Sequence, residues 1–368
     1  MRSSALFLGA AVVAMATALG AAPASAQFYD QHNLVSSDSD ADLVNAWGLV
    51  SGPATPWWVA DNGTNLSTLY NSAGVKNTNL IVQVPGKPSG LVFNAGALNP
   101  NSTNFTLTAT NNSGGRTGKA VFLFDTESGT VLAWNGGSNA VQVFPAPGGP
   151  ASGAIYKGLA IAQLDLTHAR LYATDFHNAK IDVFDENFAA VMNPNAFVDS
   201  TLPMGYAPFG IQVINGTVFV TYAQQDDDAE DDVAGHGHGF VDAYDTAGNF
   251  LMRVASRDKL DSPWGLAMTP AGWGAFGGKL LVGNFGDGLI NVFDPTVQNS
   301  DGTLEYLGFL HSTSGPPLKI EGLWALQFAQ GGANGTPDQL FFTAGPDDES
   351  AGLFGFLTPA GSPGHNKH

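Results

Sequence analysis

The sequence predicts an all-β fold, a six-bladed β-propeller of four-stranded antiparallel blades. A glycine followed by leucine or isoleucine recurs at intervals of 42 to 68 residues, and short apolar strands that end in polar residues follow most copies. The 46 glycines among 368 residues suit short strands joined by tight turns. Repeats of about 40 to 60 residues with about four strands each are typical of propellers. The six repeat starts are Gly48-Leu49, Gly90-Leu91, Gly158-Leu159, Gly210-Ile211, Gly265-Leu266 and Gly322-Leu323.

Residues 1–26 are expected to lie outside this fold, as a secretory signal peptide. Arg2 supplies a positive charge, residues 5–22 form an apolar run, and Ala24-Ser25-Ala26 is a typical cleavage site. Cleavage there leaves Gln27 first and leaves no membrane span in the mature chain. The alternative is a membrane anchor, because the apolar run approaches the length of a short span. The signal peptide predicts an exported protein, either periplasmic or secreted.

The strands of each blade follow from hydrophobic periodicity. Second strands are apolar runs such as residues 57–61, and third strands such as residues 181–185 alternate apolar and polar residues, as half-buried antiparallel strands do. Blade two is irregular, with strands predicted at residues 91–93, 105–110, 120–125 and 130–134.

The ring is expected to close through residues 33–35, which pair into the last blade and remove a free sheet edge. A single propeller over residues 27–358 follows, with a flexible tail over residues 359–368, which are rich in Gly, Pro and Ser. Each repeat glycine is expected at the crowded start of an innermost strand, where a side chain would collide across the channel.

Composition narrows the classes of function. The chain has 32 Asp and Glu residues but 14 Lys and Arg residues, a formal net charge of −18. This excess of negative charge argues against nucleic acid and anionic membrane surfaces as partners. The absence of cysteine excludes disulfides, thiolate metal sites and cysteine nucleophiles.

Motifs spread over nearly all of the chain after residue 26 resemble a known family. They include the runs at residues 45–49, 58–64, 221–225, 231–235, 262–266 and 283–288. These runs resemble an uncharacterised bacterial family of secreted, conserved-hypothetical β-propellers, which is distantly similar to NHL-repeat propellers. The resemblance implies a propeller and export but no established activity. A looser similarity connects the architecture with six-bladed lactonases and strictosidine-synthase-like proteins, but no motif matches position for position and no catalytic residue is carried over.

Polar residues at the ends of the second strands form the first candidate site. Strand ends of different blades converge on one mouth of the channel, and carboxylate and amide oxygens there could bind a divalent cation such as Ca²⁺. The alternative is that these residues cap their own turns. Blade two could add Glu127, and the last blade could add Asp347, Asp348 and Glu349. The predicted metal ligands are Asp61, Asn62, Asp175, Asn284 and Asp287.

An acidic loop in blade four forms the second candidate site. Six of the seven residues 226–232 are acidic, and His236 and His238 follow them. The carboxylates could bind calcium and the imidazoles could bind zinc or copper. The spacing does not match an EF-hand, and a solvated, mobile loop is the alternative. Asp231 and Asp232 are favoured over the acids before them, because they belong to a run that resembles the family.

Aromatic and histidine side chains leave further alternatives open. Trp47, Trp264 and Trp324 adjoin repeat glycines and are expected to pack between blades, with an aromatic ligand platform as the alternative. His168 and His311 have no partner nearby in the sequence, whereas His177 follows a strand that ends at Asp175.

Two functions are compatible with these observations. The first is a binding module that takes a small-molecule or protein ligand at the channel mouth and holds a divalent cation. The alternative is a metal-dependent, lactonase-like hydrolase, in which the cation polarises a carbonyl group and Asp175 or His177 moves the proton. A monomer is expected, although the sequence does not determine the oligomeric state.

Overall fold

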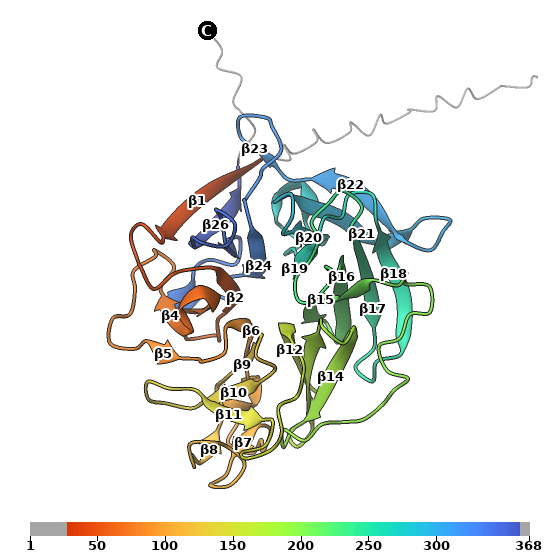
Figure 1. Ribbon diagram of the computed structural model, residues 1–368. Coiled ribbons are helices and arrows are strands. Elements are labelled where there is room, and N and C mark those ends of the chain that lie inside the picture. Colours follow the sequence, from red (N-terminus) through yellow and green to blue (C-terminus); the bar gives the residue numbers. More distant parts are fainter. Residues whose placement is uncertain (1–27, 361–368) are drawn as a thin grey trace, which may run out of the picture.

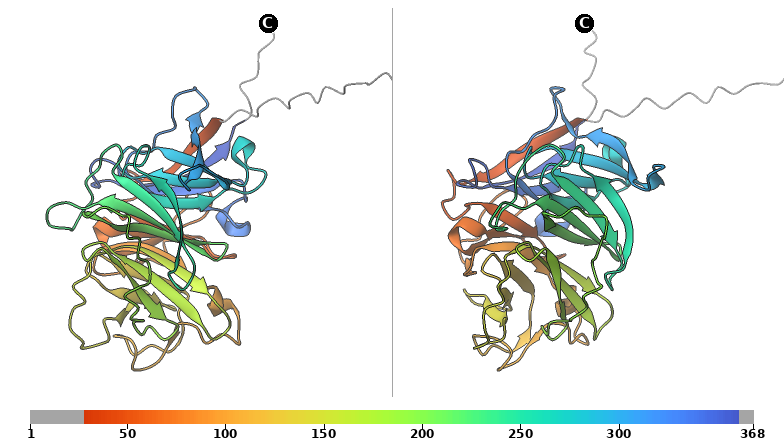
Figure 2. Two further views of the ribbon diagram at one scale, coloured as in Figure 1. Left: turned by 90° about the vertical axis from the view of Figure 1, so that its right-hand side faces the viewer. Right: turned by 45° about the vertical axis from the view of Figure 1, so that its right-hand side comes forward.

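Six antiparallel sheets surround a central axis, which confirms the predicted six-bladed propeller (Figure 1). This computed structural model describes residues 28–360, so the predicted signal peptide and residues 361–368 of the predicted tail lie outside the described residues. The strand that begins each blade lies nearest the axis (Figure 1). Views turned by 45° and by 90° show that the described residues form one body (Figure 2).

Blades one, four and five have the four strands predicted. Blade one contains β2 (Ala46–Val50), β3 (Trp57–Asp61), β4 (Leu66–Tyr70) and β5 (Val82–Gln83), with the 3₁₀ helix η1 (Asn62–Thr64) after β3. Blade four contains β15 (Tyr206–Ile214), β16 (Thr217–Gln224), β17 (Gly239–Tyr244) and β18 (Phe250–Ser256). Blade five contains β19 (Pro263–Met268), β20 (Leu280–Asn284), β21 (Ile290–Gln298) and β22 (Leu304–Phe309), with η3 (Gly274–Phe276) after β19.

Blade two also has four strands, but not the four predicted. It contains β6 (Pro88–Phe93), β9 (Phe122–Thr126), β10 (Val131–Trp134) and β11 (Val141–Phe144), with η2 (Ala95–Leu98) after β6. The strand predicted at residues 105–110 is wrong, because β7 (Thr106–Leu107) pairs with β8 (Gly118–Lys119) in a separate ribbon. Phe105 explains this departure, since its N–H donates to Glu186 O and its ring packs on Phe188 of blade three.

Blade three has three strands, so the prediction of four strands is wrong for this blade. It contains β12 (Tyr156–Gln163), β13 (Ala169–Asp175) and β14 (Lys180–Asp185). The chain after β14 makes one further bridge, between Phe184 and Ala190, and then leaves the sheet. Pro194 follows shortly, and a proline offers no N–H group to continue a ladder.

Blade six closes the ring as predicted. It contains β24 (Leu323–Phe328), β25 (Leu340–Ala344) and β26 (Leu353–Pro359), with η4 (Gly332–Asn334) between the first two. The N-terminal strand β1 (Phe28–Ser36) lies antiparallel to β26, and β23 (His311–Ser312) adds to the outer side of β1. Pro359, where the tail was predicted to begin, is the last residue of β26 and pairs with Tyr29.

The repeat glycines allow neighbouring innermost strands to approach closely. A Cβ atom on Gly210 would lie 2.2 Å from Trp264 O, and one on Gly265 would lie 2.5 Å from Trp324 O. The collision would therefore be with the backbone of the next blade, not across the channel as predicted.

In blade six the repeat position holds alanine. Leu323 and Leu326 pair with Ala344 and Phe342 across the same bulge that the other innermost strands show, which places Ala325 in register with the glycines. The predicted repeat start Gly322 instead precedes the strand and has a φ of +62°.

The hydrophobic core lies between the blades. Six buried clusters each combine residues of two neighbouring blades, and a seventh lies at the axis. Between blades six and one, for example, Trp57 packs against Phe341 with ring centroids 4.5 Å apart. No blade buries its faces alone, so the closed ring is the cooperative unit.

Candidate functional site

Apolar side chains close the channel at its middle. Residues from all six innermost strands line a central space of about 30 Å³, which is too small for a ligand. Each strand contributes one leucine or isoleucine to this lining: Leu49, Leu91, Leu159, Ile211, Leu266 and Leu326. Any site on the axis must therefore lie at one of the two mouths.

The mouth at which the innermost strands begin is filled by aromatic rings. Trp47 stacks on Trp324 with ring centroids 3.9 Å apart, and Phe285 stacks on the same indole at 4.0 Å. Trp47 and Trp324 are buried, whereas Trp264 is half-buried and meets Trp324 edge-on. The packing prediction is confirmed for Trp47 and Trp324.

A buried lysine stands among these rings. Lys157 occupies the position before the repeat glycine, where other blades place Trp47 or Trp324, and it is 1% exposed. Its Nζ lies 5.3 Å from the centroid of the Trp47 ring. It also lies 2.5 Å from Glu127 Oε1 and 2.7 Å from Asp231 Oδ1. Burial would lower the pKa of Lys157, but the two carboxylates outweigh burial and raise it.

Residues from blades one and six complete the surroundings of Glu127. Asn62 Nδ2 donates to Glu127 Oε2 at 3.1 Å. Asn45 Nδ2 donates to Glu349 Oε2 at 2.5 Å, and the Trp324 indole N–H donates to Asn45 Oδ1 at 2.8 Å. Burial, aided by the charges of Asp231 and Glu127, raises the pKa of Glu349 to about 7.

Asp232 adds a fourth carboxyl group to this place. Its Oδ2 atom is buried and has no hydrogen-bond partner among the described residues. Burial raises the pKa of Asp232 to about 6, although the neighbouring side chain of Ser262 and the charge of Lys157 oppose the shift. We refer to Lys157, Glu127, Asp231, Asp232 and Glu349 as the mouth cluster.

The acidic loop, residues 225–238, lies across this mouth. Gln225 bridges to Asp232, so residues 226–231 form the tip of a small hairpin. On the side of blade three, Gln225 Nε2 donates to Phe176 O at 2.6 Å. On the side of blade five, Gly235 N donates to Asp261 Oδ1 at 2.7 Å. The loop therefore connects blades three, four and five above the aromatic rings.

The residues predicted at strand ends make their contacts within their own blades. Asp61 Oδ2 accepts from Thr68 N at 2.9 Å. Asp175 Oδ2 accepts from Asn178 Nδ2 at 2.8 Å and lies 3.1 Å from Lys180 Nζ. These contacts correspond to the turn-capping alternative.

The other predicted rim residues lie in three separate places. Asn284 Nδ2 donates to Asp287 Oδ1 at 3.0 Å and to Lys259 O at 2.8 Å, so this pair lies between blade five and the loop that follows β18 of blade four. Asn62 alone reaches the mouth cluster, through Glu127. Asp347 and Asp348 lie exposed in the β25–β26 turn, beside Glu349.

Two of the predicted histidines, His177 and His238, contact backbone carbonyl oxygen atoms. The ring Nδ1 of His177 lies 3.1 Å from Ala229 O, and that of His238 lies 2.8 Å from Val233 O. His236 is exposed. Within residues 28–360, no three His, Asp or Glu side chains lie in an arrangement that could hold a metal ion.

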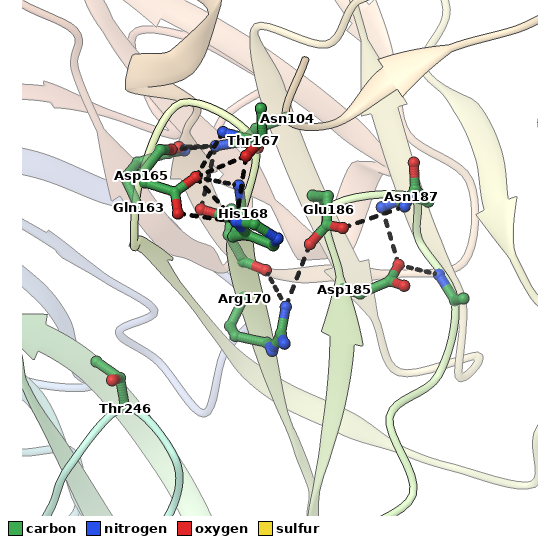
Figure 3. A network of polar contacts seen from close by, with 12 residues as sticks. Asn104, Gln163, Asp165, Thr167, His168, Arg170, Asp185, Glu186, Asn187 and Thr246 are labelled. Carbon is green, nitrogen blue, oxygen red and sulfur yellow. Dashed lines mark hydrogen bonds and ion pairs between the residues drawn. The ribbon is translucent and has the colours of Figure 1, made fainter. Parts of the chain in front are cut away.

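A second polar network lies at the opposite end of blade three (Figure 3). His168 Nδ1 lies 2.8 Å from Asp165 Oδ2, so the expectation that His168 has no partner nearby is wrong. Asp165 also accepts from the N–H of Thr167, and these bonds lower its pKa. Both side chains of the pair are more than half exposed, and Asn104 and Gln163 tie this turn to blade two. The arrangement stabilises a turn.

The sequence reasoning missed Lys157, the centre of the mouth cluster. The signal was a lysine inside an otherwise apolar innermost strand, directly before a repeat glycine. The sequence suggests Glu127 and Glu349 only as additions to the predicted ring of strand-end ligands, and Asp61 and Asp175 of that ring make their contacts within their own blades.

Comparisons with known proteins identify relatives of this chain. No protein-family model matches the sequence. It is 30% identical to the uncharacterized protein L690 of Acanthamoeba polyphaga mimivirus over 88% of this chain and 83% of L690. It is 31% identical to the uncharacterized protein R648 of the same virus over 87% of this chain and 76% of R648.

A solved structure supports the fold. A protein of unknown function from Bacteroides thetaiotaomicron has a TM-score of 0.53 at 12% identity, over 89% of this chain and 72% of that one. Among residues 28–360, no helix is long and apolar enough to cross a membrane. The relatives named above are viral, so the bacterial origin and the secretion that the resemblance implies stay predictions. At these identities and coverages, the chain belongs to the same family as the mimivirus proteins L690 and R648.

Proposed function

We propose that the protein is a binding module whose mouth cluster and acidic loop bind a cationic ligand. For a divalent cation such as Ca²⁺, the simplest such ligand, the carboxyl groups would have to move together on binding, because no three of them are arranged to hold a metal ion in the described residues. One observation carries the proposal: the buried ammonium group of Lys157 contacts the carboxylates of Glu127 and Asp231, and two further carboxyl groups, those of Asp232 and Glu349, lie near enough for its charge to act on them. The propeller provides a rigid ring on which loops of several blades meet, which is how scaffolds commonly position binding residues.

The electrostatics of the mouth support a cationic ligand. The pKa values of Asp232 and Glu349 are raised to about 6 and 7, because burial and neighbouring carboxylates disfavour their ionised forms. A bound cation would favour those ionised forms. The acidic loop also carries Asp227 and Asp228, which are exposed at its tip, and the half-buried Asp226 before them. Carboxylate oxygens are the ligands that calcium prefers.

Calorimetric titration of the full chain with calcium chloride tests the proposal. We expect calcium to bind and to raise the melting temperature, because a ligand that binds only the native state stabilises it. Glu349→Gln and the double variant Asp231→Asn, Asp232→Asn should weaken binding, whereas Asp301→Asn, in a turn of blade five, should not. The proposal fails if neither calcium, magnesium nor zinc binds, or if Asp301→Asn weakens binding equally.

The same titration distinguishes the mouth cluster from the ring of strand ends expected from the sequence. If Asp61→Ala, Asp175→Ala and Asn284→Ala abolish binding while the mouth variants retain it, the cation binds at the strand ends. Loss only with Asp231→Asn or Asp232→Asn would locate it in the acidic loop.

Hydrolysis is the second candidate function, and one observation favours it. Glu349 has a pKa of about 7 in the vicinity of Lys157, and a general acid or base works best when its pKa lies near the operating pH. Asp175 fits this role less well, because its own turn occupies its carboxylate. A panel of lactones tests this function: turnover that is lost in Glu349→Gln but kept in Glu305→Gln supports it, and absence of turnover argues against it.

A further inference from the structure

A cavity of about 180 Å³ lies on the propeller axis, where five of the innermost strands end. Its walls come from β2, β6, β12, β15 and β24, or from residues just after them, and these strands surround the axis in Figure 1. It shares Leu49, Leu91 and Gln212 with the closed central space. Ile161, another lining residue, lies four residues beyond Lys157 in β12, so the cavity is at the opposite end of the channel from the mouth cluster. We refer to this cavity as the far mouth.

The far mouth is lined mainly by apolar side chains, and all of the described residues in its walls are uncharged. Leu91, Val92 and Ile161 provide aliphatic surface, and the ring of Phe93 adds aromatic surface. A Cβ atom on Gly52 would lie 2.7 Å from the Phe93 ring, so this glycine lets the ring pack against the chain of blade one. Small-molecule sites commonly combine such a lining with a few polar groups at fixed positions.

One of the polar groups in this cavity is a buried hydroxyl group without a partner. Ser51 lines the far mouth and is 1% exposed, and its Oγ atom has no hydrogen-bond partner among the described residues. Blade six holds this turn in place, because Gln330 Nε2 donates to Ser51 O at 3.2 Å. Asn334 Nδ2 also donates to Gly52 O, at 3.0 Å. A buried hydroxyl group without a partner is unfavourable, and a ligand that bonds to Ser51 would remove this cost.

Two half-buried glutamines add amide groups to the same cavity. Gln212 belongs to β15 and Gln327 to β24, and both line the far mouth. A side-chain amide can both donate and accept hydrogen bonds, as the hydroxyl group of Ser51 can. The hydroxyl groups of sugars and polyols also do both, so they match this set of polar groups.

We propose that the far mouth binds an uncharged polyhydroxy compound, such as a monosaccharide, through hydrogen bonds from Ser51, Gln212 and Gln327 to its hydroxyl groups. The C–H groups of the sugar ring lie against Phe93 and the aliphatic walls. The volume of about 180 Å³ favours a ligand of about one ring, since sites for drug-sized ligands start at about 300 Å³. A charged ligand is disfavoured, because no side chain in the described walls offsets the loss of its hydration. This site is independent of the cation binding proposed for the mouth cluster.

Calorimetric titration of the full chain at constant ionic strength tests this proposal, with glucose, galactose and ribose as uncharged sugars. Sodium glucuronate is the charged match for glucose, and cyclohexanol is a ring that carries a single hydroxyl group. We expect at least one sugar to bind at least about fivefold more tightly than both matches, because further hydroxyl groups add hydrogen bonds and a carboxylate loses hydration. The proposal is overturned if none of the sugars binds at millimolar concentrations. It is also overturned if glucuronate or cyclohexanol binds as tightly as the best sugar.

Variants test whether the ligand lies in the far mouth. Gln212→Leu and Gln327→Leu should each weaken sugar binding by about fivefold, as the loss of one hydrogen bond would. Gln298→Leu, at the exposed end of β21, is the matched control and should leave the affinity unchanged. An equal loss of affinity in this control would overturn the proposal.

Ser51→Ala provides a test that does not depend on the folding of the glutamine variants. It removes a hydroxyl group that has no partner among the described residues, so the melting temperature without sugar should not fall. Sugar binding should nevertheless weaken by about fivefold. A lower melting temperature would show that the hydroxyl group already bonds within the protein, which would count against its role in binding. Unchanged affinity in Ser51→Ala and in both glutamine variants would overturn the proposal.

Discussion

Lys157 Nζ and Asp231 Oδ1 lie 2.7 Å apart, although 74 residues separate them in the chain. The pair joins the innermost strand of blade three to the acidic loop of blade four. The two partners differ in exposure to solvent: the lysine side chain is 2% exposed and the aspartate side chain is 70% exposed. The lysine therefore depends on its carboxylate partners, whereas water can solvate the aspartate if the loop moves.

Replacing the buried lysine should destabilise the ring. In Lys157→Met the carboxylates of Glu127 and Asp231 lose their ammonium partner, and removing one partner of a buried ion pair costs about 3 kcal/mol or more. Urea unfolding measures the change in the free energy of unfolding. Lys319→Met, at an exposed position, is the control. A loss no larger than that of the control would show that the mouth cluster contributes nothing to stability.

Removing the exposed partner should loosen the loop with little effect on global stability. Asp231→Asn keeps the size of the side chain but lacks the charge, and we expect it to cost less than about 1 kcal/mol, as for other exposed ion pairs. Hydrogen exchange of residues 225–238 should become faster. Asp228→Asn, at the hairpin tip, should leave exchange unchanged, and equal rates in the two variants would contradict the anchoring role of Asp231.

Stability should fall as the pH rises from about 5 to about 7. The pKa of Glu349 is raised from 4.5 to about 7, and that of Asp232 is raised from 3.8 to about 6. The native state thus binds protons that the unfolded state has released, and the free energy of unfolding decreases with pH across this window. In Glu349→Gln the decrease should be smaller, as measured by melting temperatures across the pH series. Glu305→Gln should retain the wild-type slope; identical slopes in all three proteins would refute the contribution of Glu349.

Adding a methyl group at a repeat glycine should push the innermost strands of two neighbouring blades apart. The Cβ of Gly210→Ala would lie 2.2 Å from Trp264 O, and we expect a loss of about 3 kcal/mol, since overpacking typically costs about 1 to 3 kcal/mol. Thermal unfolding measures it. Gly272→Ala is the matched control, because no atom lies within 4 Å of its added Cβ. Equal melting temperatures would show that the innermost strands can separate without cost.

Export can be tested at the N-terminus. We expect mass spectrometry of the exported protein to find Gln27 as its first residue, because signal peptidases cleave after a small-x-small sequence. Ala26→Leu should cause the uncleaved precursor to accumulate, whereas Ala22→Leu should be processed normally. An exported chain that retains residues 1–26 would favour the membrane-anchor alternative.

Much of the fold was accessible from the sequence because the repeat is a local pattern. Gly48-Leu49 and Gly265-Leu266 mark innermost strands because glycine lets the backbone of the next blade approach closely, and five of the six blades have glycine at this position. Closure through Val35 followed from the need to cover a sheet edge. Three features depart from the repeat: Ala325 replaces the glycine in blade six, Thr106 lies in a separate ribbon, and blade three lacks a fourth strand after β14.

The sequence by itself determined the propeller, its six blades and the acidic character of the chain, since periodicity, turn residues and charge can be read along a single strand or loop. Only the tertiary structure decided which polar groups meet. The carboxylates of Asp61 and Asp175 accept hydrogen bonds within their own blades, whereas Lys157, Glu127 and Glu349 come together from three different blades. Convergence depends on loop conformations and on side chains far apart in the chain, and strand periodicity carries no information about either.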